Sequence, residues 1–153
     1  KHIDKLEDDE VFVFGSNTEG MHAGGAARMA MNWGAIYGKA FGLQGKTFAI
    51  PTVDYRRSGK MSVDEIKKYV DEFLDFTIKN KDKKFLVTEI GCGIAGFKVS
   101  EIAPLFRKAL EYNNVYLPER FINYLKENNW YTKNFNLVKN RSIILYFIHI
   151  PNI

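Results

Sequence analysis

Residues 11–25 read Val-Phe-Val-Phe-Gly-Ser-Asn-Thr-Glu-Gly-Met-His-Ala-Gly-Gly. The first four are apolar and β-prone, and a run of this kind predicts a short strand buried in a sheet. Residues 15–25 contain four glycines and predict a loop. Residues 26–33 are helix-prone and largely apolar, so a helix is expected to follow. This order predicts a glycine-rich loop at the carboxyl end of a buried strand.

The alternation of strands and helices continues along the chain. Residues 62–65, Ser-Val-Asp-Glu, have the pattern of a capping box and predict a helix start, and apolar side chains keep helical spacing from Ile66 to Ile78. Ser100 is expected to cap a further helix, with Glu101 in its first turn. The other expected elements are strands at 47–50 (ended by Pro51), 85–88 and 114–118, and a helix at 119–128. Strands alternating with helices predict an α/β domain whose sheet is covered on both faces.

The composition places limits on the class of protein. The chain has 153 residues, a length typical of one domain. Its single cysteine, Cys92, excludes an intramolecular disulfide and is typical of a reducing compartment, so a cytoplasmic location is expected. The first residues are polar, and no apolar run approaches the ~20 residues of a membrane helix. We therefore expect no signal peptide and no membrane partner.

The charge of the chain favours phosphate-bearing partners. The net charge is +4 and the pI is about 9.1. A basic surface attracts phosphates on a small metabolite or on a nucleic acid. The densest cluster, residues 79–84 (Lys-Asn-Lys-Asp-Lys-Lys), lies between an expected helix and an expected strand and indicates a solvated loop, with a nucleic-acid patch as the alternative. A basic nucleic-acid-associated protein without enzymatic activity is therefore the second functional hypothesis.

A second glycine-rich loop, Gly91-Cys92-Gly93-Ile94-Ala95-Gly96-Phe97, follows the strand expected at 85–88. Its glycines match the G-x-G-x-x-G spacing of a Rossmann site, but its position does not, because that site would follow the first strand and open a helix directly. The first loop lacks the Lys-Ser/Thr pair of a Walker A motif, because Met21 and His22 occupy those positions. In open α/β sheets, ligands bind outside the carboxyl ends of the strands. Successive amides in glycine-rich turns form concave anion sites. Further free amides are expected at the start of the helix near Ala26. Two such loops predict a site for an anionic ligand.

Five side chains near these loops each have two interpretations. Asn17 contacts a ligand or stabilises the turn after the strand. His22 is a phosphate donor or general base, or a surface histidine. Asp54 orients a water or is an exposed loop carboxylate. Cys92 is a nucleophile activated by the anion site, or a small residue that fills the loop. Phe97 is a ring that covers the ligand, or a core residue.

Several short motifs together resemble the macrodomain family. Phe-Gly-Ser-Asn followed by Gly-x-His and Gly-Gly-Ala-Ala is similar to the first ligand loop of macrodomains, and Gly-Cys-Gly-Ile-Ala-Gly-Phe is similar to their phosphate loop. The nearest resemblance is to a bacterial and phage macrodomain-like group, over about residues 10–122. The motifs are Phe-Gly-Ser-Asn (14–17), Gly-x-His (20–22), Gly-Gly-Ala-Ala (24–27), Gly-Leu-Gln-Gly (42–45), Ile-Pro-Thr (50–52), Gly-Cys-Gly-Ile-Ala-Gly-Phe (91–97) and Ile-Ala-Pro-Leu-Phe (102–106).

The resemblance implies a three-layer α/β/α sandwich with a mixed, mostly parallel sheet over residues 1–127. Residues 128–153 would be a C-terminal extension, either an extra edge strand or a disordered tail. The implied ligand is ADP-ribose or a related phosphate-bearing nucleotide-sugar, held between the two loops. Residues 3–10 do not match the Gly-Asp-Ile pattern with which macrodomains recognise adenine, so the resemblance supports the phosphate and ribose end of the site.

The same resemblance implies roles for individual residues. Asn17 would meet the distal ribose with Phe97 beside it, the amides of residues 91–96 would hold the diphosphate, and His22, Gly24 and Gly25 would line one end. Hydrolysis of an ADP-ribosyl linkage, with Asn17, His22 or Asp54 orienting the water, and binding alone remain two alternatives. No metal or cofactor is expected, because no Cys/His cluster has ligand spacing. The expected ligand-binding residues are Gly15, Ser16, Asn17, Gly20, His22, Gly24, Gly25, Gly91, Cys92, Gly93, Ile94, Ala95, Gly96 and Phe97.

Overall fold

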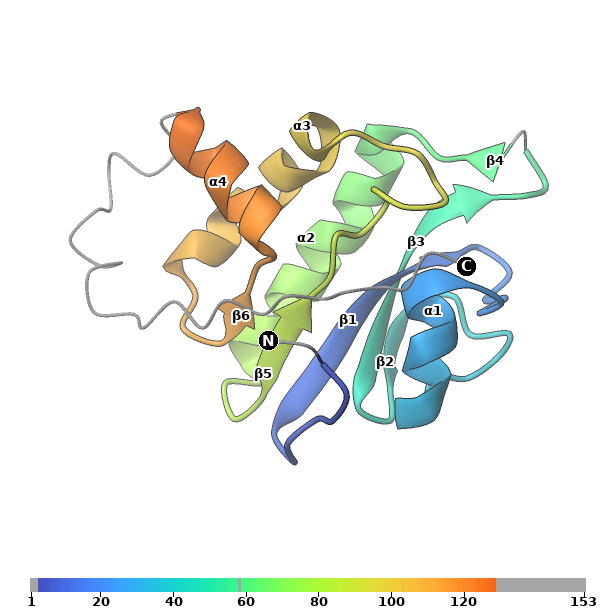
Figure 1. Cartoon of the computed structure of the whole chain (residues 1–153), viewed down its shortest axis with the longest axis horizontal. Helices are drawn as coiled ribbons and strands as arrows, with labels where there is room; N and C mark the ends of the chain where they lie inside the picture. The colour runs from blue at the N-terminus through green and yellow to red at the C-terminus, as the bar shows by residue number, and fades with distance from the viewer. Residues whose placement is uncertain (1–2, 58, 129–153) are drawn as a thin grey trace.

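The computed structural model describes residues 3–57 and 59–128. These residues form a mixed α/β fold of six strands, four α-helices and two 3₁₀ helices, η1 and η2 (Figure 1). The elements in chain order are β1 (Glu10–Asn17), α1 (Gly25–Ala30), η1 (Met31–Trp33), β2 (Gly42–Gln44), β3 (Thr47–Asp54), β4 (Gly59–Lys60), α2 (Val63–Lys79), β5 (Lys84–Val87), α3 (Val99–Ile102), η2 (Ala103–Glu111), β6 (Val115–Tyr116) and α4 (Glu119–Glu127).

The strand order of the sheet is β2-β3-β1-β5-β6, with β4 also paired to β3. β1 is parallel to β3 and β5, and β5 is parallel to β6, whereas β2 and β4 run antiparallel to β3. The predicted α/β class is confirmed, with a mixed and mostly parallel sheet. The chain passes from β1 to β3 on one side and later to β5 on the other, so the strand order reverses at β1. In open α/β sheets, ligands bind at such a reversal, outside the carboxyl ends of the strands.

The side chains of β1 alternate between two hydrophobic clusters, as the pleat of a strand requires. Val11 and Val13 belong to the larger cluster, which is filled by residues of α2, η2 and α4. Phe12 and Phe14 belong to the smaller cluster, which includes the buried alanines of α1. In Figure 1, α1 lies in front of the sheet and α2 lies behind it. The central strand is therefore buried on both sides, as its continuous apolar run predicts.

The capping box at the start of α2 is confirmed. The Ser62 hydroxyl accepts from the Glu65 amide at 3.2 Å, and the Glu65 carboxylate accepts from the Ser62 amide at 2.9 Å. The expected apolar face of this helix is buried except at its end, where Ile78 is 42% exposed. Thr77 takes the buried position of that turn instead, because its hydroxyl donates to the Leu74 carbonyl at 2.7 Å and is satisfied within the helix.

The prediction that Pro51 ends its strand is wrong, because β3 continues through it to Asp54. Proline has no N–H to donate, so it fits a strand only where no neighbour needs that donor. β2 pairs with β3 no further than Ala49, and β4 pairs from Val53 onward. Pro51 lies between the two paired stretches, so neither antiparallel neighbour loses a hydrogen bond. β2 and β4 have no counterpart among the strands expected from the sequence.

The prediction that Ser100 caps a helix is also wrong. α3 begins at Val99, and the amide of Lys98 donates to the Glu101 carboxylate at 2.8 Å. The following segment is the 3₁₀ helix η2, with Pro104 in its first turn. Since Pro104 lacks the N–H that would continue α-helical bonding, the change of helix type has a local cause.

No helix among residues 3–57 and 59–128 is long and apolar enough to cross a membrane. The expected C-terminal extension comprises residues 128–153, and residues 129–153 of it lie outside the described residues.

Candidate functional site

The two glycine-rich loops meet at the carboxyl edge of the sheet. A methyl group at Gly15 would lie 3.5 Å from the backbone nitrogen of Gly91, and one at Gly24 would lie 3.3 Å from Cδ1 of Ile94. Figure 1 shows the loop after β5, in yellow, reaching over the ends of β1 and β3 toward β4. The structure therefore brings residues 15–25 and 91–96 together.

The second loop consists of two consecutive turns. The amide of Cys92 donates to the Glu89 carbonyl at 3.0 Å, and the amide of Gly96 donates to the Gly93 carbonyl at 2.9 Å. The amide of Phe97 closes the loop by donating to the Gly91 carbonyl at 2.9 Å. Gly91 has a φ of 77° and Gly96 a φ of 72°, conformations that favour glycine. The glycine spacing of the sequence thus fits the positions where these turns need a left-handed residue.

Four amides of this loop are free to bind a ligand. In the part of the chain that the structure describes, the amides of Gly91, Gly93, Ile94 and Ala95 donate to no acceptor. Gly93 and Ile94 are exposed, whereas Gly91 is buried. A buried N–H without a partner is costly, and such groups are normally satisfied by water or a ligand. The turns therefore use some of the loop's amides and leave a set that can hold an anion.

The first loop presents a second set of free amides. Within the described residues, the amides of Ala23, Gly24 and Gly25 have no acceptor. They follow the buried His22 and include the first residue of α1, Gly25, in a helix of only six residues. Because Gly24 is adjacent to Ile94, both sets of amides border the same surface.

Side-chain contacts hold the second loop from two directions. On one side, Arg120 of α4 donates to the Glu89 carboxylate at 2.7 Å. On the other, the Lys60 ammonium of β4 donates to the Gly96 carbonyl at 3.2 Å and lies 4.1 Å from the centre of the Phe97 ring. The loop is thus anchored at both ends, while its central amides remain free.

Asn17 organises the first loop with all of its polar side-chain atoms. Its Nδ2 donates to the Met21 carbonyl at 2.7 Å. Its Oδ1 accepts from the amides of Glu19 and Met21, at 3.2 and 2.9 Å. The side chain is buried. These bonds support the interpretation of Asn17 as a residue that stabilises the turn, and its contact with a ribose stays a prediction.

His22 is buried between the loop and its neighbours rather than exposed at the surface. Its Nε2 donates to the Ile36 carbonyl at 3.0 Å, and its ring meets that of Phe14 edge to face. Because a carbonyl can only accept, Nε2 carries the proton and Nδ1 faces the Ser16 hydroxyl at 3.5 Å. Both ring nitrogens are engaged inside the protein, so its predicted role as a base requires these contacts to break.

Asp54 is the last residue of β3 and is buried, so the interpretation as an exposed loop carboxylate is wrong. Its side chain belongs to an ion-pair network. One carboxylate oxygen accepts from the Arg57 side chain at 2.8 Å, and the other accepts from the Arg56 amide at 3.1 Å. The hydrogen bond from Arg57 holds the pKa of Asp54 below its usual range. An ionised carboxylate with both oxygens bonded is a weak candidate for activating water.

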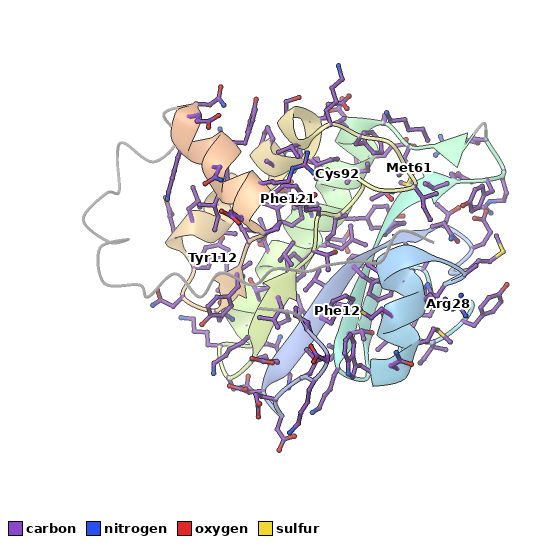
Figure 2. The ribbon with its side chains drawn as sticks, viewed as in Figure 1. Phe12, Arg28, Met61, Cys92, Tyr112 and Phe121 are labelled. Carbon is purple, nitrogen blue, oxygen red and sulfur yellow. The ribbon has the colours of Figure 1, made fainter. Side chains whose placement is uncertain are left out.

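Cys92 and Phe97 belong to the larger hydrophobic cluster. Cys92 packs against that cluster on the side toward α4, where Phe121 lies (Figure 2). Burial, with the nearby Glu89 carboxylate as the next cause, raises the pKa of Cys92 to about 11. The thiol is therefore protonated at neutral pH, which favours its role as a loop-filling residue. Phe97 is 5% exposed, which supports its role as a core residue under the loop.

Two residues that support the site were not singled out from the sequence. Gln44 is buried in the Gly-Leu-Gln-Gly motif, where it accepts from the Ile36 amide at 2.7 Å and donates to the Lys39 carbonyl at 2.9 Å. It thereby fixes the segment on which Gly20 packs, and a polar residue between two glycines is a signal for such a role. Lys60 gave no comparable signal, because β4 has only two residues and its pairing is not local.

The lysine-rich cluster lies at the other edge of the sheet, before β5. Lys84 pairs with Asp9 at 3.0 Å, and Lys83 lies 3.8 Å from Asp82. The cluster borders a cavity of about 630 Å³. The cavity is lined by acids as well as lysines: Asp9, Ile78, Lys81, Asp82, Lys84, Glu111, Tyr112, Asn113, Asn114 and Tyr116. This mixture of charges is poorly matched to a polyanion.

Within residues 3–57 and 59–128, no group of three or more His, Cys, Asp or Glu side chains could hold a metal ion. Comparisons with protein-family models, curated proteins and solved structures found no match.

Proposed function

We propose that this protein binds ADP-ribose or a related phosphate-bearing nucleotide-sugar on the surface where its two glycine-rich loops meet. The observation that carries the proposal is the set of free amides at Gly91, Gly93, Ile94 and Ala95, in a loop whose ends are anchored by other contacts. An anion at this position would accept several N–H bonds without any rearrangement of the loop.

The energetics favour a phosphate group over a neutral ligand. A hydrogen bond to a charged group contributes about 1.5–3 kcal/mol, roughly twice a neutral bond. Two or three such bonds contribute about 3–9 kcal/mol, a large part of the roughly 8 kcal/mol of micromolar binding, and the remaining contacts of the ligand must offset the entropic cost of association. The free amides of Ala23, Gly24 and Gly25 would extend the contact along the ligand toward its sugar.

The location within the fold supports the same proposal. Both loops follow strands that end at the edge where the strand order reverses, which is the usual ligand position in α/β sheets. We propose in addition that the arrangement is a macrodomain-like three-layer α/β/α sandwich. The two separate clusters, one with α1 and one with α2, η2 and α4, support this assignment.

Binding without hydrolysis is the function that the contacts favour. Asn17, His22 and Asp54 all bond to the protein itself, and the bonds of Asn17 and His22 hold the first loop in place. In this proposal the groups that face the ligand are backbone amides, and Asn17 and His22 set the shape of the first loop that presents them.

Calorimetric titration of the protein with ADP-ribose, ADP, AMP and ribose 5-phosphate tests the proposal. We expect ADP-ribose to bind most tightly, because it carries both the diphosphate and the distal ribose. Binding of none of the four would contradict the proposal. Tight binding of RNA or DNA whose affinity falls steeply with salt would support a nucleic-acid partner instead, because such binding releases many counterions.

A further inference from the structure

Lys60 occupies a distinctive position beside the second loop. Its ammonium donates to the Gly96 carbonyl at 3.2 Å and lies 4.1 Å from the centre of the Phe97 ring. The side chain comes from β4, whose antiparallel pairing places Lys60 opposite Val53 of β3. The charge is thus delivered to the loop from a different part of the chain.

Three other cations near this edge of the sheet are paired with carboxylates. Arg56 lies 3.1 Å from Glu19, Arg57 lies 2.6 Å from Glu65, and Arg120 lies 2.7 Å from Glu89. Lys60 is exposed, and among residues 3–57 and 59–128 it has no carboxylate partner. No described carboxylate therefore neutralises its charge, and its ammonium bonds to the same loop that carries the four free amides.

We infer that Lys60 is a ligand-binding residue, and that it makes the loop selective for a group with two negative charges, such as a diphosphate. This inference rests on the proposed function, since it assigns the charge to the same site. An ammonium has three donors, and the bond to Gly96 uses one of them. The other two are available to a phosphate oxygen while the first still holds the loop.

The Gly96 carbonyl and the Phe97 ring hold the Lys60 ammonium at this position. The Gly96 carbonyl and the face of the Phe97 ring both attract a cation, and together they fix the ammonium without neutralising it. A singly charged ligand would be satisfied by the amides alone. A doubly charged ligand gains an additional charge-assisted bond from Lys60.

The test compares Lys60→Met and Lys60→Gln with the unmodified protein, using pyrophosphate and ADP-ribose as probes in calorimetry. Lys60→Met keeps an apolar stem over the Phe97 ring but removes the charge. The matched control is Lys46→Gln, because Lys46 is also a lysine bonded to a backbone carbonyl, that of Glu7, at 3.3 Å. We expect both Lys60 variants to bind the two probes roughly tenfold more weakly and the control to bind as before.

Hydrogen exchange of the Gly96 and Phe97 amides separates a binding role from a structural one. We expect their protection in the ligand-free protein to be the same in Lys60→Met and in the unmodified chain. Loss of that protection, or unchanged affinity for both probes, would overturn the inference.

Two further outcomes distinguish the inference from the proposed function. Binding of pyrophosphate that depends on Lys60, without binding of ADP-ribose, would overturn the proposed function and leave the role of Lys60 intact. No binding of either probe would overturn both.

Discussion

A methyl group at position 15 is a small change that reaches the second loop without straining the fold. Gly15 is a residue of β1 and is not among the glycines with positive φ. A Cβ there would lie 3.5 Å from the nitrogen of Gly91, 3.6 Å from Cγ2 of Ile90 and 3.7 Å from Oγ1 of Thr52, all ordinary van der Waals distances. Gly15→Ala therefore fits the protein but covers the Gly91 amide.

The expected loss of affinity exceeds the expected change in stability. Losing one hydrogen bond from an amide to a phosphate costs about 1.5–3 kcal/mol, which weakens binding of ADP-ribose roughly 10- to 150-fold. Alanine in place of glycine in a strand stabilises the fold by about 0.5–1 kcal/mol, because the unfolded chain loses conformational freedom, but shielding the Gly91 N–H from water costs about 1–3 kcal/mol. A variant that stays folded with a modest change in stability and binds much less tightly is the predicted result.

The assay for Gly15→Ala is calorimetric titration with ADP-ribose, combined with urea unfolding of the same preparation. Unfolding controls for structural damage, since a destabilised variant would lose affinity for a different reason. Unchanged affinity in a stable Gly15→Ala protein would refute the assignment of the Gly91 amide to the ligand site.

Four other predictions test separate features of the structure. A side chain at Gly93 would meet nothing within 4 Å, so Gly93→Val should leave urea unfolding unchanged while its branched side chain hinders the exposed amides and lowers the affinity measured by calorimetry. The hydrogen bond from the Ser62 amide lowers the pKa of Glu65 from 4.5 to about 2, so its stabilisation is fully present above pH 4.5 and is lost as the pH falls through about 2. Glu65→Gln should flatten that part of the stability profile in urea unfolding, and an unchanged acid limb would contradict the capping role. Phe73 is fully buried, so Phe73→Ala should lower the free energy of unfolding by about 3–5 kcal/mol in the same assay, and a loss below 1 kcal/mol would not fit the described core. The pKa of Cys92 is raised to about 11, so we expect iodoacetamide to alkylate the thiol slowly at pH 7 and faster at high pH. Fast alkylation at pH 7 would instead support the interpretation of Cys92 as a nucleophile.

The elements that the sequence predicted correctly depend on local patterns. The apolar run of β1 and the capping box of α2 are confirmed because burial on both faces and N-terminal capping each leave a signature within a few residues. β2 and β4 contain three and two residues, too few for a periodic pattern, and form only through pairing with β3. Ser100 was a plausible cap by residue type, but Glu101 bonds to the amide of Lys98 and moves the helix start.

The candidate site was predictable at the level of loops and not at the level of side chains. Glycine spacing indicated which segments turn at the carboxyl edge of the sheet, and residues 15–25 and 91–96 do meet there. The sequence left open whether Asn17 contacts a ligand or stabilises the turn, and it did not indicate that His22 bonds inward, because the contact with Ile36 depends on how the loop folds back. Lys60 was not predictable at all, since its contact with Gly96 spans 36 positions of sequence.

Amide NMR during titration with ADP-ribose observes each backbone N–H separately and therefore reports directly on the free amides of the second loop. We expect the amide signals of Gly91, Gly93, Ile94 and Ala95 to move downfield as the ligand accepts their hydrogen bonds, together with smaller shifts at Ala23 to Gly25. If these amide signals stay fixed at saturating ADP-ribose, the proposal that the amides bind the ligand is contradicted.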